Sequence, residues 1–399
     1  MIQRLLLQLL VLCVLFITSC QQHATESNIK SVKVDSIVVP TPAVIVETPR
    51  AMNRTFNDIA FYLAGMKQEE GTTLQIKDSN AEWKAYAAKT DASWVRFNAN
   101  KLNRISSWID KELKEVHTQT QTVFYPFSGP DFLNMYTFFP DAKNFIMIGL
   151  EPIGLIPDVK KIPKDSLHKY LGTIQQSLYS ILNLSFFKTI DMAEDFKSEQ
   201  LDGIVTDLFI FIVRTGNTIV DVRPVEINDQ GEIVNGEFIS ATNVDKNKIS
   251  GVEIVFESKD KVQKTLHYFS ADLWDRSFQK DSGFLQYIKN QGVITSYLKS
   301  ASYLLHKDYF SIVRKIILTQ SKFLLQDDSG IPYHFFTPSV WDVQLYGSYD
   351  KPINLFKNWY QEDLKAAYND SNRTIKSLNF GIGYNFQISQ SNLMLMRKK

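Results

Sequence analysis

Residues Thr122–Gly154 read TVFYPFSGPDFLNMYTFFPDAKNFIMIGLEPIG, and we expect the fold to be organised around them. Residues 123–125 are β-branched or aromatic, which is typical of a buried strand. Pro126 and Pro130 have no backbone donor and Gly129 can adopt positive φ, so the chain must turn sharply after this strand. The stretch therefore predicts a strand that ends in a tight turn.

A helix and a second strand are expected directly after this turn. Asp131 can cap the first amide groups of a helix, and apolar residues then recur at helical spacing. Residues 145–148 form a continuous apolar run, as in a strand that is covered on both faces. Glu151 follows that run, where the loops of an open α/β sheet gather at the carboxyl edge. We infer a Rossmann-like strand–helix–strand unit with Glu151 at the edge of the sheet.

The same unit allows a nucleotide-binding interpretation. The dinucleotide fingerprint combines three glycines after the first strand with an acidic residue about twenty positions further on. Gly129 is the only glycine in this turn, so the phosphate cradle is incomplete. Glu151, however, follows the turn at about the spacing expected of the acidic residue. We favour the interpretation that these turn residues serve only to bend the chain sharply. A degenerate methyltransferase-like nucleotide-binding fold is kept as an alternative.

The first residues have the pattern of an export signal. Arg4 precedes the apolar stretch Leu5–Phe16, which is shorter than the ~20 residues of a membrane-spanning helix. Ile17–Cys20 resembles the lipobox of bacterial lipoproteins, whose cysteine receives diacylglycerol and palmitate. We therefore expect residues 1–20 to be a lipoprotein signal peptide and Cys20 to carry the lipid anchor.

Residues 21–50 are polar and then rich in valine and proline without a helical period, which predicts an extended linker. No acidic residue follows Cys20 closely, so the lipoprotein sorting rules give no reason for retention in the inner membrane. We expect a periplasmic protein of the cell envelope, held at the periplasmic face of the outer membrane. The only other cysteine, Cys13, lies inside the signal, which excludes disulfides and cysteine-based sites in the mature chain.

The composition is that of an ordinary globular protein. The chain is 44% hydrophobic and 22% charged with a net charge of +1, so it can bury a large core and has no electrostatic case for binding nucleic acid. Helical periodicity over residues 51–115 predicts an N-terminal helical cap. We assign residues 116–399 to a mixed α/β domain that packs with this cap.

Two hairpins are predicted downstream. The first joins Leu208–Val213 to Thr218–Val225 around a Thr-Gly-Asn turn, and the second joins Val252–Glu257 to Thr265–Phe269. Hairpins require antiparallel pairs, so the sheet cannot be purely parallel. The fold class is therefore α/β or α+β, with a mixed β-sheet and helices on its faces; a doubly wound parallel sheet is the lesser alternative.

A second unusual cluster is Gln326–His334, which reads QDDSGIPYH. Asp327 and Asp328 follow an apolar run and His334 lies near, so the cluster has groups for acid–base chemistry. The same residues are common turn formers, and we favour a turn. No second set of ligands stands at a fixed spacing, so we expect no metal site.

At these clusters the chain resembles a family of uncharacterised bacterial proteins. Members pair Tyr-Pro-Phe-Ser-Gly-Pro-Asp with Gly-Leu-Glu-Pro-Ile/Val-Gly and carry a late Gln-Asp-Asp-Ser-Gly-Ile-Pro. The matching positions are Tyr125–Asp131, Gly149–Gly154 and Gln326–Pro332. The resemblance implies no particular activity.

Three functions are compatible with the sequence. No cofactor can be assigned from it. The first is a lipid-anchored envelope protein that binds a small molecule or protein partner through a pocket formed by residues 125–131, 149–154 and 326–334. The second is an envelope hydrolase or transferase with carboxylate acid–base catalysis, and the third is the nucleotide-binding alternative, which export disfavours. The candidate pocket residues are Tyr125, Ser128, Gly129, Asp131, Glu151, Asp327, Asp328 and His334.

Overall fold

A computed structural model of the chain describes residues 49–68, 70–72, 74, 80–184, 197–198, 201–243, 249–280 and 282–399. The signal peptide, Cys20 and nearly all of the expected linker lie outside the described residues. Within the described part, no helix is long and apolar enough to span a membrane.

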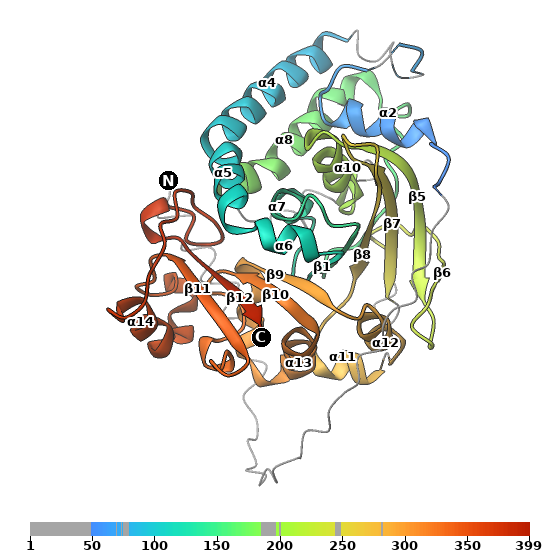
Figure 1. The fold of residues 1–399 in the computed structure, drawn as a ribbon. Coiled ribbons are helices and arrows are strands. Elements are labelled where there is room, and N and C mark those ends of the chain that lie inside the picture. The colour runs from blue at the N-terminus through green and yellow to red at the C-terminus, as the bar shows by residue number, and fades with distance from the viewer. Residues whose placement is uncertain are drawn as a thin grey trace. The chain divides into compact units, whose positions relative to one another are not determined.

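A ten-stranded mixed sheet runs through the described structure, in the order β11-β12-β10-β9-β1-β2-β8-β7-β5-β6 (Figure 1). The five central strands, from β10 to β8, are parallel, and the strands on either side are antiparallel to their neighbours. The prediction of a mixed sheet with a Rossmann-like start is confirmed. The strands are β1 Thr122–Tyr125, β2 Asn144–Gly149, β5 Thr218–Ile227, β6 Ile233–Asn235, β7 Ser250–Glu257, β8 Gln263–Ser270, β9 Ile294–Leu298, β10 Ser321–Gln326, β11 Trp341–Gly347 and β12 Asn392–Lys398.

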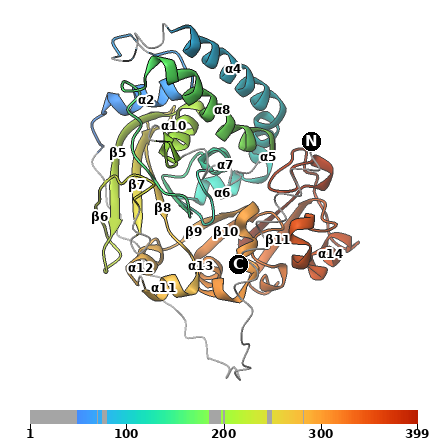
Figure 2. The ribbon, with the colours of Figure 1, turned by 180° about the vertical axis from the view of Figure 1, so that it is seen from behind.

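Helices cover both faces of the sheet (Figures 1 and 2). Val123 and Tyr125 of β1 belong to one apolar core and Phe124 to the other, as the two-residue period of a strand requires. The helix after β1 lies on the first face, whereas those between β8 and β10 lie on the second. The direction of winding therefore reverses between β1 and β9. The helices on the first face include α7 Phe132–Phe138, α8 Leu167–Leu184 and α10 Val205–Arg214; those on the second include α11 Asp275–Lys280, α12 Ser282–Asn290, α13 Ser311–Gln320 and α14 Glu362–Asn369.

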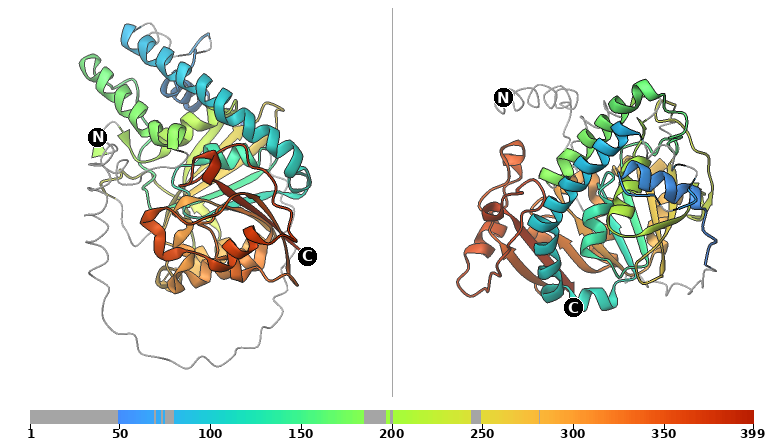
Figure 3. Two further views of the ribbon diagram at one scale, coloured as in Figure 1. Left: turned by 90° about the vertical axis from the view of Figure 1, so that its left-hand side faces the viewer. Right: turned by 90° about the horizontal axis from the view of Figure 1, so that it is seen from above.

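The expected helical cap is present. It comprises α2 Arg54–Leu63, α4 Ala81–Phe97, a π-helical turn Asn98–Leu102, α5 Asn103–Glu112 and α6 Lys114–Gln119. Asn53 and Asn80 cap the first two helices through their side chains. Helix α2 packs on α10 and β5, and α4 lies along α8 (Figure 3). The cap therefore covers the sheet largely through other helices.

The first predicted hairpin is wrong. Residues 208–213 belong to α10, in which every residue from Val205 to Val213 is buried. A short apolar run of this kind fits a buried helix as well as a buried strand, because a fully buried helix has no polar face. Gly216 has φ +86 just beyond the end of this helix. The second hairpin is confirmed, since β7 and β8 pair antiparallel.

Gly154, the last residue of the opening stretch, lies where two backbones touch. Its φ is +76, and a Cβ on it would lie 1.6 Å from the carbonyl oxygen of Asp202. A Cβ on Gly203 would likewise lie 2.3 Å from the carbonyl oxygen of Ile153. Neither position has room for a side chain. Gly154 therefore serves the packing of this segment against the start of α10.

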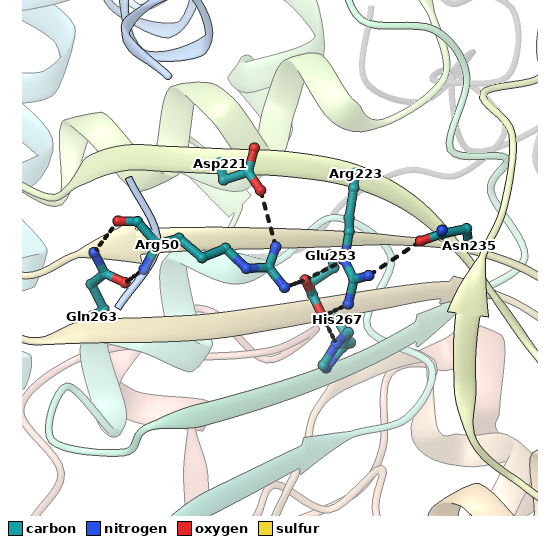
Figure 4. Close-up of polar contacts among 7 residues, drawn as sticks. All are labelled: Arg50, Asp221, Arg223, Asn235, Glu253, Gln263 and His267. Atoms are coloured by element: carbon teal, nitrogen blue, oxygen red, sulfur yellow. Dashed lines mark hydrogen bonds and ion pairs between the residues drawn. The ribbon is translucent and has the colours of Figure 1, made fainter. Parts of the chain in front are cut away.

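A network of charged side chains fastens Arg50 to the antiparallel part of the sheet (Figure 4). The Arg50 guanidinium pairs with Asp221 at 3.0 Å and with Glu253 at 2.5 Å. Its backbone N–H donates to the side chain of Gln263, whose amide donates back to the Arg50 carbonyl. The first described residues are therefore held on β5, β7 and β8.

Glu253 is the centre of this network. Its side chain is only 5% exposed, and it accepts two hydrogen bonds from Arg223 and lies 2.9 Å from Nε2 of His267. Burial alone would raise the pKa of Glu253, but the hydrogen bonds from His267 and Arg223 and the charge of Arg50 hold it well below its ordinary value. The ionised carboxylate therefore stabilises three neighbours at once.

Replacing Glu253 with glutamine is expected to lower the free energy of unfolding by about 1–3 kcal/mol, because both arginines lose a charge-assisted partner. Urea denaturation of the two proteins measures this difference. Asp221→Asn is the control, since it breaks one half-exposed pair and should cost below ~1 kcal/mol. Equal losses for both variants would contradict the central role of Glu253.

Candidate functional site

A cavity of about 290 Å³ opens at the carboxyl edge of the parallel strands. Most of its lining comes from the ends of four adjacent strands and the segments that follow them: residues 125–131 at β1, 148–151 at β2, 271–273 at β8 and 299–304 at β9. Phe310 and Tyr384 complete it. Winding reverses between β1 and β9, so the cavity lies at the topological switch point, where open α/β sheets bind ligands.

The turn after β1 is held by its own hydrogen bonds. Phe127 and Gly129 both have positive φ, +58 and +51. The Ser128 N–H donates to the carbonyl of Ile148, and its hydroxyl lies 2.8 Å from the carbonyl oxygen of Gly129. Ser128 is thus committed to shaping the turn, and neither of these hydrogen bonds supplies a base that would make it a nucleophile.

The side chain of Glu151 lies over two glycines, Gly129 in the turn after β1 and Gly149 at the end of β2. A Cβ on Gly129 would be 3.4 Å from Oε1 of Glu151, and one on Gly149 only 2.5 Å from Oε2. The Tyr268 hydroxyl donates to the backbone carbonyl of Glu151 at 2.9 Å and lies 3.4 Å from Oε2. Burial and the charge of Glu151 raise the pKa of Tyr268 well above 10, so it remains a donor. The glycines make room for the carboxylate and Tyr268 positions it.

A buried ion pair stands at the inner end of the cavity. Nζ of Lys299 lies 2.6 Å from Oδ2 of Asp131, and both side chains are only 2% exposed. Asp131 caps α7 by accepting from the backbone N–H of Asn134, and it also accepts from the Tyr125 hydroxyl at 3.1 Å. Lys299 directly follows β9 and is not among the site residues predicted from the sequence. A lysine after an apolar run is the only signal that the sequence offers for it.

Asp327 and Asp328 lie behind this pair rather than in the cavity lining. Asp327 accepts from the backbone N–H groups of Ser329 and Ser300, and Asp328 accepts from Tyr303 and Asn392. Burial raises the pKa of both carboxyls, and the charge of Asp328 adds to the rise at Asp327. Their hydrogen bonds join a buried turn to β12 and to the segment after β9.

The structure brings five of the eight candidate residues to the cavity and places three elsewhere. His334 is exposed on a short 3₁₀ turn, and no residue of the 326–334 segment lines the cavity. This segment follows β10, one strand further from the switch point than β9, so its expected place is taken by residues 271–273, 299–304 and Tyr384. The five cavity residues are Tyr125, Ser128, Gly129, Asp131 and Glu151.

In the described part of the chain, no group of three or more histidine, cysteine, aspartate or glutamate side chains is arranged to hold a metal ion. The fold and the site define a class: an α/β protein with a mixed, doubly wound sheet and a pocket at its switch point. No family model, curated protein or solved structure matches the chain significantly.

Proposed function

We propose that this protein binds a nucleoside in the switch-point cavity, with the carboxylate of Glu151 accepting hydrogen bonds from the ribose hydroxyls. The observation that carries the proposal is the position of Glu151 at the end of β2, over the bare backbone of Gly129. In doubly wound sheets an acidic residue about twenty positions beyond the glycine turn binds the ribose.

The size of the cavity supports a single nucleoside over a dinucleotide. Its volume of about 290 Å³ is near the lower end of the range for small-molecule sites. The turn after β1 also lacks two of the three glycines that a pyrophosphate requires, since Gly129 is the only glycine between Tyr125 and Leu133. Both features fit a ligand with one sugar and one ring system.

The walls of the cavity are suited to a flat ring. Phe127 and Phe310 meet edge to face with centroids 5.5 Å apart, and Tyr384 packs against Phe356 behind it. Leu273 and Leu304 add apolar surface to the lining of the same cavity. An aromatic base between such walls gains both burial and favourable ring contacts.

Reversible binding is favoured over carboxylate acid–base catalysis. Asp327 and Asp328 stand outside the cavity lining, where Asp327 accepts from the N–H of Ser329 and Asp328 from the side chain of Asn392. Asp131 is held by Lys299 and by the cap of α7. Asp272, the remaining carboxylate of the cavity lining, is exposed and accepts from the backbone N–H of Trp274. The export proposed below argues against a cytoplasmic cofactor, but it is compatible with a free nucleoside that is bound in the periplasm.

Glu151→Gln is expected to weaken the binding of adenosine at least about tenfold, because a neutral amide replaces a charged acceptor for two hydroxyl donors. Isothermal titration with adenosine and with 2′,3′-dideoxyadenosine measures the effect. The dideoxy compound lacks the diol, so it should bind both proteins equally weakly. A monosaccharide such as ribose tests whether the diol suffices without a base. Equal affinity of wild type and variant for adenosine would overturn the role of Glu151.

We also propose that the protein is a lipoprotein of the bacterial envelope, anchored through Cys20 and facing the periplasm. The support is the charged and apolar leader that ends in Ile-Thr-Ser-Cys at Ile17–Cys20.

Metabolic labelling with a fatty-acid probe should mark the wild-type protein and leave Cys20→Ala unlabelled. Cys13→Ala is the matched control and should keep the label, because Cys13 lies inside the leader. An unlabelled wild type that fractionates with soluble proteins would contradict the anchor.

A further inference from the structure

Ser300 has a strained backbone and an unsatisfied hydroxyl at the cavity. It lines the cavity directly after Lys299, and its φ is +61, in the left-handed region that residues other than glycine rarely adopt. Its side chain is buried, and its Oγ has no hydrogen-bond partner within the described structure. A buried hydroxyl without a partner is costly, so its presence requires an explanation.

The surrounding structure holds Ser300 in this conformation. Its backbone N–H donates to Oδ2 of Asp327 at 3.3 Å, and the preceding N–H of Lys299 donates to the Ser302 hydroxyl. Strained residues that are fixed in this way cluster at ligand sites. The buried turn at Asp327 therefore contributes to the cavity indirectly, because it holds Ser300 in place at the cavity wall.

Two lysine side chains lie near this segment. Lys299 lines the cavity, and Lys101 stands near it on the π-helical turn of the cap, an irregularity that is frequent at functional sites. Within the described residues the side chain of Lys101 has neither a hydrogen bond nor an ion pair. Burial and the charge of Lys299 lower the pKa of Lys101 to about 7. Two amines thus share one carboxylate, Asp131, while the raised pKa of Asp327 reduces its negative charge.

We propose that Ser300 and Lys299 form a second subsite of this cavity, which binds a carboxylate or phosphate group of the ligand. The hydroxyl of Ser300 would donate to the anion, and Lys299 would supply the charge while it keeps its pair with Asp131. The subsite rests on the proposed function in sharing its cavity. An anion there would add a second negative charge beside the two amines that share Asp131.

The test uses the full chain and two small probes, acetate and inorganic phosphate, at constant ionic strength. Apparent affinities come from the dependence of the melting temperature on probe concentration. Wild type should be stabilised by at least one probe, and which of them acts distinguishes a carboxylate site from a phosphate site. Ser300→Ala should bind that probe at least about tenfold more weakly, since it loses a hydrogen bond to a charged group.

Ser258→Ala is the matched control, because Ser258 is another buried serine whose hydroxyl has no partner in the described structure, and it does not line the cavity. It should respond to the probe as wild type does. Ser300→Gly removes the hydroxyl and relaxes the positive φ, so it keeps the test valid if Ser300→Ala folds poorly. Stabilisation of Ser300→Ala or Ser300→Gly equal to that of wild type, or no stabilisation of wild type, would overturn the subsite.

Adenosine separates this inference from the proposed function. It carries no anion, so Ser300→Ala should bind it as wild type does, whereas Glu151→Gln should bind the anion normally and adenosine weakly. Anion binding without adenosine binding would support the anion subsite and contradict the nucleoside proposal. Adenosine binding without anion binding would support the nucleoside proposal and contradict the anion subsite.

Discussion

Replacing Asp131 with alanine is expected to lower the free energy of unfolding by about 3–5 kcal/mol. The substitution leaves Lys299 charged and buried without its carboxylate, and this loss exceeds the value of the pair itself. It also removes the acceptor for the Tyr125 hydroxyl and the cap of α7. Urea denaturation followed by circular dichroism measures the change.

Two variants sharpen this prediction. Asp141→Ala breaks the contact of an exposed aspartate with His117, so it should cost less than ~1 kcal/mol. Asp131→Leu combined with Lys299→Met replaces the whole pair with apolar groups and should recover part of the loss. A loss below ~1 kcal/mol for Asp131→Ala would mean that Lys299 finds another partner or solvent, and the ion pair would then have little role in stability.

Gly154→Ala is expected to cost at least about 4 kcal/mol or to prevent folding. The new Cβ would lie 1.6 Å from the backbone oxygen of Asp202, so two segments of main chain must separate, and φ is +76. Soluble yield and thermal denaturation measure the outcome. Gly172→Ala in α8 is the matched control: its Cβ meets nothing within 4 Å, so it should raise stability by up to ~1 kcal/mol. A folded Gly154→Ala with unchanged melting temperature would contradict the close contact.

The Rossmann-like unit could be predicted because its signals are local. The turn at Pro126–Pro130, the cap at Asp131 and the apolar run before Gly149 each act on neighbouring residues, and the structure has β1, α7 and β2 there. Helix α10 was misread because its residues are buried on all sides, which removes the periodicity that distinguishes a helix from a strand.

The inner end of the site could not be predicted, because it depends on strand order. Lys299 and Ser300 come close to Asp131 only because β9 pairs with β1, although the two strands are far apart in the sequence. Tyr268 meets Glu151 only because β8 lies beside β2. For the same reason the Asp327–Asp328 turn, whose strand is one place further out, remains outside the cavity lining.

The most direct test of the nucleoside proposal is a crystal structure of the protein with adenosine. We predict that the ribose hydroxyls lie within about 3.2 Å of the Glu151 carboxylate, and that the base lies between Phe127, Phe310 and Tyr384. Adenosine bound elsewhere on the protein, or in the cavity with its ribose directed away from Glu151, would contradict the proposed function.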